Sequence, residues 1–99
     1  MKKLLFILIC LPIIGFGQQT YVPDDNFEQE LIYLGYDNFL DNYVQTSNIN
    51  MLDSINLESI NISDLTGIED FVSLTFLGCG DNQLSTIDIS QNILLKVLH

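Results

Sequence analysis

Apolar residues recur in this chain at intervals of 21 to 22 positions, with the same uneven steps each time. Steps of three, three and two form one row, repeated 22 positions later: Ile49, Leu52, Ile55 and Leu57, then Phe71, Leu74, Leu77 and Cys79. This spacing fits neither the 3.6-residue period of a helix nor the alternation of a strand. Recurrence over this length is typical of a solenoid, whose coils bury their apolar rows by stacking on one another.

The second repeat carries a recognisable motif. Leu74-x-x-Leu77-x-Cys79-x-x-Asn82-x-Leu84 matches the leucine-rich-repeat pattern L-x-x-L-x-L-x-x-N/C-x-L, with Cys in a Leu position. More narrowly, residues 61–92 resemble the internalin-like repeats of secreted bacterial surface proteins, and residues 21–37 resemble the N-terminal cap found with them. The resemblance implies a leucine-rich-repeat solenoid, an α/β-type right-handed superhelix used for binding.

Each coil of such a solenoid contributes a short strand to a parallel sheet on the concave face. We expect strands near residues 54–57, 75–79 and 96–98. The resemblance also places Asn82 inward, where its amide would satisfy backbone groups at the bend after the strand. Residues that alternate with the inward ones should face the concave surface, and they form the candidate binding face: Ser54, Asn56, Phe76, Gly78 and Val97.

Phe76 and Val97 occupy equivalent positions in successive coils. They should lie side by side, because adjacent parallel strands are about 4.8 Å apart. An apolar pair flanked by small and polar residues would suit a protein side chain or the face of a sugar. The alternative is that Phe76 only packs along Val97 and stabilises the sheet.

The first coil requires a cover over its open end. Asp25-x-x-Glu28 is a capping-box pattern, and it predicts an amphipathic helix over residues 26–34 that ends at Gly35. One face of this helix would be apolar, formed by Phe27, Leu31 and Leu34. We therefore expect a cap over residues 18–48 and leucine-rich repeats over residues 49–99, with an incomplete C-terminal end typical of an N-terminal fragment.

The N-terminus has the three parts of a secretory signal peptide. Lys2 and Lys3 precede an apolar run, and Gly15-Phe16-Gly17 offers small residues for cleavage after Gly17. The run is shorter than the roughly 20 residues that a membrane-spanning helix needs. Residues 1–17 are thus predicted to be removed, which would leave a secreted or cell-surface protein without a membrane anchor.

Residues 18–99 contain one Lys and 13 acidic residues, a net charge of −12. A surface this acidic repels phosphate backbones and anionic lipids, so nucleic-acid and membrane-surface binding are not expected. It suits cationic or neutral partners and divalent cations, and it also accounts for solubility alone.

Catalytic groups are scarce in the sequence. The sole His is His99, and Cys79 is the only Cys after cleavage and occupies a core position. A Ser–His or Cys–His pair and a zinc site therefore lack members. We predict no enzyme activity and no cofactor.

An acidic loop begins at Asp37, and caps related to the one that this sequence resembles can carry an EF-hand-like loop. Positions 3, 6 and 12 of that register are Phe39, Asn42 and Asn48, where an oxygen ligand, Gly and bidentate Glu are required. An EF-hand is excluded on this ground. A weak calcium site at Asp37 and Asp41 remains open, and local side-chain hydrogen bonds in turns are the alternative.

These observations predict a secreted or surface-displayed module that binds a protein or a glycan through its concave face. Two alternatives remain open. One is a structural spacer that displays a further C-terminal domain, and the other is the non-catalytic part of a larger secreted enzyme.

Overall fold

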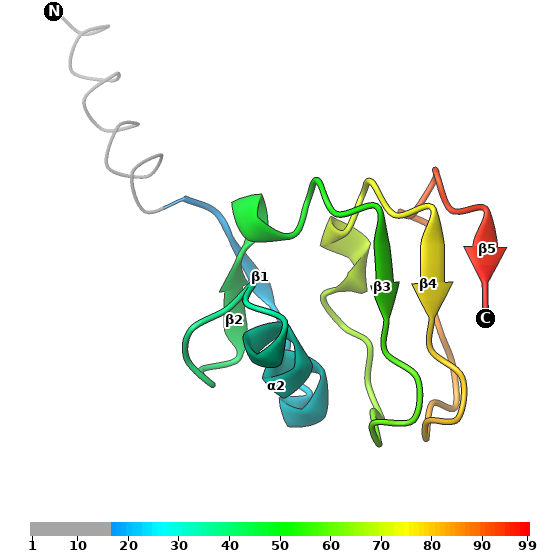
Figure 1. The fold of residues 1–99 in the computed structure, drawn as a ribbon, viewed down its shortest axis with the longest axis horizontal. Coiled ribbons are helices and arrows are strands. Elements are labelled where there is room, and N and C mark those ends of the chain that lie inside the picture. The colour runs from blue at the N-terminus through cyan, green and yellow to red at the C-terminus, as the bar shows by residue number, and fades with distance from the viewer. Residues whose placement is uncertain (1–16) are drawn as a thin grey trace, which may run out of the picture.

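The structure, a computed structural model, describes residues 17–99. Residues 1–16 of the predicted leader lie outside the described residues. The helix α2 (Asp25–Tyr33) and an antiparallel pair of strands, β1 (Gln19–Tyr21) and β2 (Tyr43–Gln45), form one end of the molecule (Figure 1). Among the described residues, no helix is long and apolar enough to cross a bilayer.

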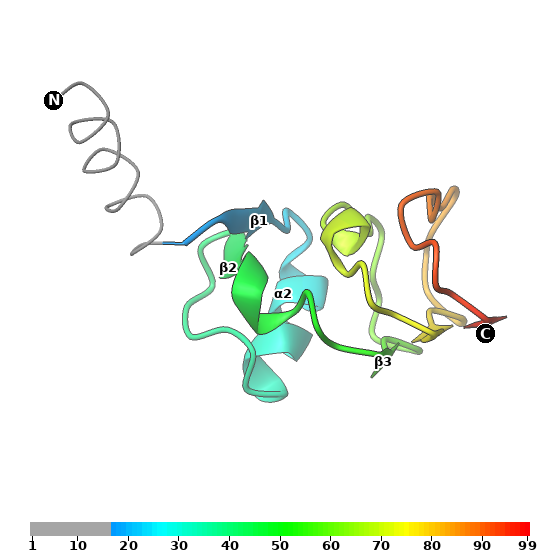
Figure 2. The same ribbon diagram turned by 90° about the horizontal axis from the view of Figure 1, so that it is seen from above.

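Two stacked coils and the start of a third follow this N-terminal part. Each contributes one strand to a three-stranded parallel sheet, in the order β3 (Ser54–Asn56), β4 (Phe76–Gly78) and β5 (Val97–Leu98). The strands lie at the expected positions and are one or two residues shorter. Figure 2 shows the strands along one side of the coils and the loops, with the 3₁₀ helix η2 (Ile68–Asp70), along the other. A second 3₁₀ helix, η1 (Thr46–Asn48), joins β2 to the first coil.

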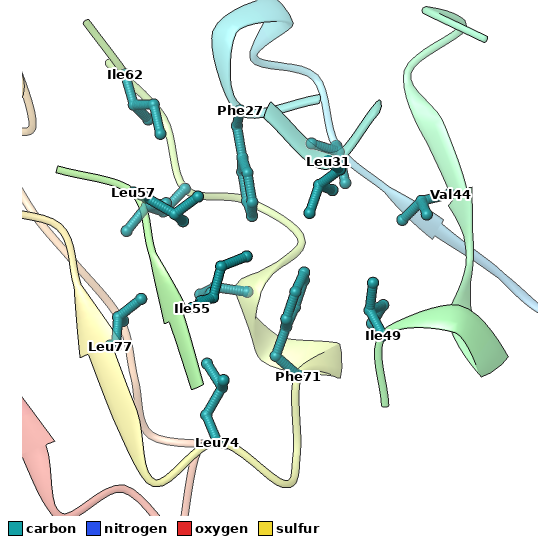
Figure 3. Packing of buried hydrophobic residues seen from close by; sticks show 13 residues of the cluster. Phe27, Leu31, Val44, Ile49, Ile55, Leu57, Ile62, Phe71, Leu74 and Leu77 are labelled. Atoms are coloured by element: carbon teal, nitrogen blue, oxygen red, sulfur yellow. The ribbon is translucent and has the colours of Figure 1, made fainter. Parts of the chain in front are cut away.

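The apolar rows meet in a single core between α2 and the two coils. Phe27 from the helix lies against Phe71 from the coils, with ring centroids 5.9 Å apart (Figure 3). Fully burying one such side chain contributes about 1.5–3 kcal/mol. The core therefore joins the helix and the coils into one folding unit. Its buried apolar residues are Val22, Phe27, Leu31, Val44, Ile49, Ile55, Leu57, Ile62, Leu65, Ile68, Phe71, Leu74 and Leu77.

The start of α2 differs from the predicted capping box. The N-cap residue is Asp24, whose Oδ1 accepts hydrogen bonds from the backbone N–H groups of Asn26 and Phe27. Its Oδ2 accepts from the N–H groups of Ser63 and Asp64 in the first coil. One carboxylate thus both caps the helix and attaches it to the coil, a long-range role that sequence spacing cannot reveal.

The prediction of a single apolar helix face was wrong at its C-terminal end. Phe27 and Leu31 are buried, whereas Leu34 is 42% exposed. Leu34 is the C-cap residue, and Gly35 follows with a φ of +91°, a left-handed conformation that ends the helix as expected. The chain turns away from the core at this point, which leaves Leu34 on the surface.

The second coil is less buried than the first, since no further coil covers it within residues 17–99. Ile87 lies 22 positions after the buried Leu65 but is 38% exposed, and Leu98 is 48% exposed. Asn92, by contrast, is only 4% exposed. Its amide donates to the carbonyl oxygens of Ile68 and Phe71 at 2.9 and 3.0 Å.

Candidate binding face

The five residues of the predicted face lie on three adjacent strands. Ser54 pairs with Phe76, and Phe76 pairs with Val97, so these three side chains form one row across the sheet. Ile55 and Leu77 alternate with them along the strands and are buried in the core. Side chains that alternate along a strand point to opposite faces, so the row points outward. We call this outward side of β3, β4 and β5 the strand face.

Exposure varies along the row. Ser54 is exposed, Phe76 is partly buried and Val97 is 47% exposed. The partly buried ring of Phe76 and the side chain of Val97 therefore both present apolar surface to solvent.

Gly78 pairs with Asn56 in a second row, but it is buried. A Cβ atom at Gly78 would lie 2.7 Å from Asn56 Oδ1 and 3.3 Å from Glu58 Cγ. Both side chains therefore lie over β4 at this position, and they would have to shift to admit a Cβ atom. Gly78 shapes the strand face by this close approach and presents no side chain of its own.

Glu58 is a residue of the strand face that sequence reasoning missed. Its Oε2 forms a hydrogen bond with His99 Nδ1, 41 residues further along the chain. The same Oε2 would lie 3.5 Å from a Cβ atom at Gly80. The carboxylate thus extends across the sheet from the end of β3 to the end of β5. Gly78 and Gly80, on either side of Cys79, were the sequence signal for this contact. Glycines within a strand often mark a place where another group approaches the backbone.

Asn82 holds the bend after β4 as expected. Its amide nitrogen donates to the carbonyl oxygens of Leu57, Cys79 and Gly80 at 2.7, 2.9 and 3.2 Å. Its Oδ1 accepts from the backbone N–H groups of Ile60 and Ile62. One amide therefore satisfies five backbone groups in two coils, which fixes how β3 and β4 end beside each other.

Cys79 lies in the wall between the two coils. The thiol is free and partly buried, and it packs against the core. Burial raises the pKa of the Cys79 thiol, and the Glu58 carboxylate raises this pKa further. The thiol is thus held in its protonated, less nucleophilic form.

Three carboxylates gather in the N-terminal region, away from the strand face. Oxygen atoms of Glu28, Asp37 and Asp41 all lie within 4.8 Å of one another. Asp37 and Asp41 are the two residues at which the sequence left a weak calcium site open. Glu28, from α2, is the third member of the cluster. These oxygens are of the type that calcium prefers, although the loop lacks the EF-hand residues at positions 3, 6 and 12.

Glu28 already has structural partners in this cluster. Its two oxygens accept hydrogen bonds from the backbone N–H groups of Asp41 and Asn42 at 3.1 and 2.7 Å. The residue is fully buried, and burial, together with the nearby Asp37 side chain, raises its pKa to about 7. Glu28 was predicted to complete a capping box, but it anchors the loop after α2 instead.

Comparison with known proteins is consistent with this geometry. The chain is 33% identical over 72 residues to Internalin J of Listeria monocytogenes serotype 4b (strain F2365), which covers 73% of this chain and 8% of that protein. The chain therefore spans a small part of that relative. No model of a known protein family matches the sequence.

Two solved structures have the same fold. The functional domain of InlJ from Listeria monocytogenes, which includes a cysteine ladder, matches with a TM-score of 0.67 and 32% identity, over 80% of this chain and 18% of that one. An internalin, InlF, from Listeria monocytogenes strain 4b F2365 matches with a TM-score of 0.71 and 18% identity, over 80% of this chain and 24% of that one. The second match shows the fold alone.

Proposed function

Because this chain is an internalin-like leucine-rich-repeat protein, we propose that it is a non-catalytic module that binds another protein through its strand face. One observation carries the proposal. The register places Phe76 between Ser54 and Val97, so that an aromatic ring stands in the centre of an outward row. Aromatic residues in central, well-packed positions contribute disproportionately to protein–protein binding.

The proposal includes the organisation of the chain. Residues 18–48 form the cap, with α2 over the first coil, and residues 49–99 form repeats of a right-handed solenoid whose strand face is concave. The protein is exported to the cell surface or the medium, and cleavage follows Gly17. Mass spectrometry of the exported protein tests this part, because an N-terminus at Met1 would contradict it.

A glycan partner and a purely structural spacer are the other candidates. A sugar face would also stack on Phe76. A spacer would use the Phe76–Val97 contact only to stabilise the sheet. A protein partner is favoured because a row of small, aromatic and aliphatic side chains beside the Glu58 carboxylate combines an apolar centre with a charged edge, as protein interfaces do.

Site-specific photo-crosslinking tests the proposed face. The crosslinker p-benzoylphenylalanine replaces Phe76 in one variant and Ile87, an exposed residue outside the strands, in a control. We expect the variant at position 76 to capture a protein on irradiation, and the variant at position 87 not to do so. Capture from position 87 alone would place the binding surface elsewhere, and capture of glycan alone would favour the carbohydrate alternative.

A further inference from the structure

The strand face has a charged end as well as an apolar row. Glu58 follows β3, and its side chain crosses Gly78 and approaches Gly80. A Cβ atom at position 78 would lie 3.3 Å from Glu58 Cγ and 2.7 Å from Asn56 Oδ1, so both side chains would have to shift. The backbone is therefore built to let one carboxylate lie beside the Phe76 row, and the strand face ends on this carboxylate.

Charges are unevenly distributed over the sheet. Lys96 is the only Lys or Arg of residues 17–99, and it precedes β5, at the start of the strands. Glu58 and the exposed Asp81 both follow their strands, at the opposite end. His99 is exposed, and its Nδ1 already contacts Glu58 Oε2. A Lys or Arg of a partner would therefore have to share this carboxylate with the His99 ring or displace the ring from it.

We propose that the strand face takes a basic protein segment, with an aliphatic or aromatic side chain against Phe76 and Val97 and a Lys or Arg beside Glu58. This inference rests on the proposed function and names the chemistry of its partner. Charge complementarity supports it, because the chain from residue 18 onward carries a net charge of −12 and the acidic end of the sheet adjoins the apolar row.

The geometry of β4 sets the distance between the apolar and the basic side chain of the bound segment. The Phe76 and Gly78 positions are two residues apart, which corresponds to about 7 Å along a strand. Side chains two positions apart in an extended segment lie on one face and span the same distance. The expected motif is therefore an apolar residue two positions away from a basic one.

Selection from a phage-displayed library of random dodecapeptides tests the motif on the full chain. We expect peptides selected on the wild-type protein to combine Lys or Arg with a nearby apolar residue. The variant Glu58→Gln should bind those peptides about tenfold more weakly, because a charge-assisted contact is lost. Its binding should also depend less on salt than that of the wild type. Asp25→Asn removes the same charge from an exposed residue of α2, and it should bind like the wild type.

The outcomes separate this inference from the proposed function. Wild-type selection without basic enrichment, or equal affinity for Glu58→Gln, overturns the inference. If Phe76→Ser abolishes binding in the same experiment, the strand face still stands as the binding surface. If Phe76→Ser leaves the affinity unchanged, both proposals fail. Failure to select any peptide on the wild-type protein also overturns the inference. Melting curves of each variant exclude loss of folding as the cause.

Discussion

The two coils share one apolar pattern but differ in how far they bury it. The first coil, residues 49–70, lies between α2 and the second coil, and its Leu65 is 5% exposed. The equivalent residue of the second coil, Ile87, is 38% exposed, because no coil covers it among residues 17–99. The difference teaches that the repeat pattern fixes which way a side chain points, whereas its neighbours decide how much surface is buried.

Two asparagines extend the comparison. Asn82 joins the coils on the strand side and satisfies five backbone groups. Asn92 occupies the position of Phe71 one coil later and donates to two carbonyl oxygens, while its Oδ1 is buried without a hydrogen-bond partner. The junction at Asn82 is thus fully satisfied and the one at Asn92 is not.

The largest effect is expected for Leu77 when it is compared with Leu98, its register partner on β5. Leu77→Ala should lower the free energy of unfolding by about 2–5 kcal/mol, because it leaves a cavity in the core. Leu98→Ala should cost less than about 1 kcal/mol, since Leu98 is 48% exposed. Urea denaturation of both variants measures the difference, and equal losses would contradict the asymmetry of the coils.

A smaller difference is expected between the two asparagines. Asn82→Ala should cost about 3 kcal/mol, because five backbone groups lose their partner. Asn92→Ala should cost about 1 kcal/mol, because the loss of two hydrogen bonds is offset by removal of an unpaired buried oxygen. Thermal unfolding of the pair measures this, and a larger loss for Asn92→Ala would reverse our ranking of the two junctions.

The N-terminal region around α2 should respond to pH through Glu28. Its pKa rises from 4.5 to about 7 on folding, so the folded state binds the proton more tightly than the unfolded state. The stability that depends on Glu28 is therefore greatest below about pH 4.5 and falls, by on the order of 2 kcal/mol, as the pH rises to about 7.

Melting temperatures measured from pH 4 to pH 8 test this dependence. Glu28→Gln cannot ionise, so its melting temperature should change less over that interval than that of the wild type. The pKa values of Asp64 and Asp88 are lowered by hydrogen bonds from Thr66 and Ser90, so their contributions change at more acidic pH. Parallel curves for wild type and Glu28→Gln would refute the role of Glu28.

The smallest effect concerns Cys79, which lies between the buried first coil and the open second coil. Its raised pKa and partial burial should make it react with a maleimide at least several-fold more slowly in the native state than in 6 M urea. Mass spectrometry of timed samples gives both rates. Rapid native labelling would show that this position opens to solvent.

The coil architecture could be predicted because the 21- to 22-residue period depends on local spacing. Phe76 and Val97 fell in register for the same reason. The role of Asn82 at its bend was expected from the resemblance to leucine-rich repeats. The contacts of the N-terminal region were harder to predict from the sequence. Asp24 binds residues of the first coil, and Glu28 binds a loop 13 and 14 positions away, so neither role follows from helix spacing.

The strand face was predicted in outline but not in detail. Alternation along the strands identifies its outward residues, yet it says nothing of a side chain that crosses from another strand. Glu58 lies outside β3, and only the folded sheet brings it over Gly78. The burial of Gly78 and the charge of this end therefore emerge from the three-dimensional arrangement.

The central claim is that the row around Phe76 binds a partner and does not merely stabilise the sheet. The most direct test is to titrate the protein captured by crosslinking against wild type and Phe76→Ser, with melting curves of both. We predict that Phe76→Ser weakens binding by at least tenfold, while the melting temperature changes by only a few degrees. Unchanged affinity together with a large fall in melting temperature would contradict the claim and assign Phe76 a structural role.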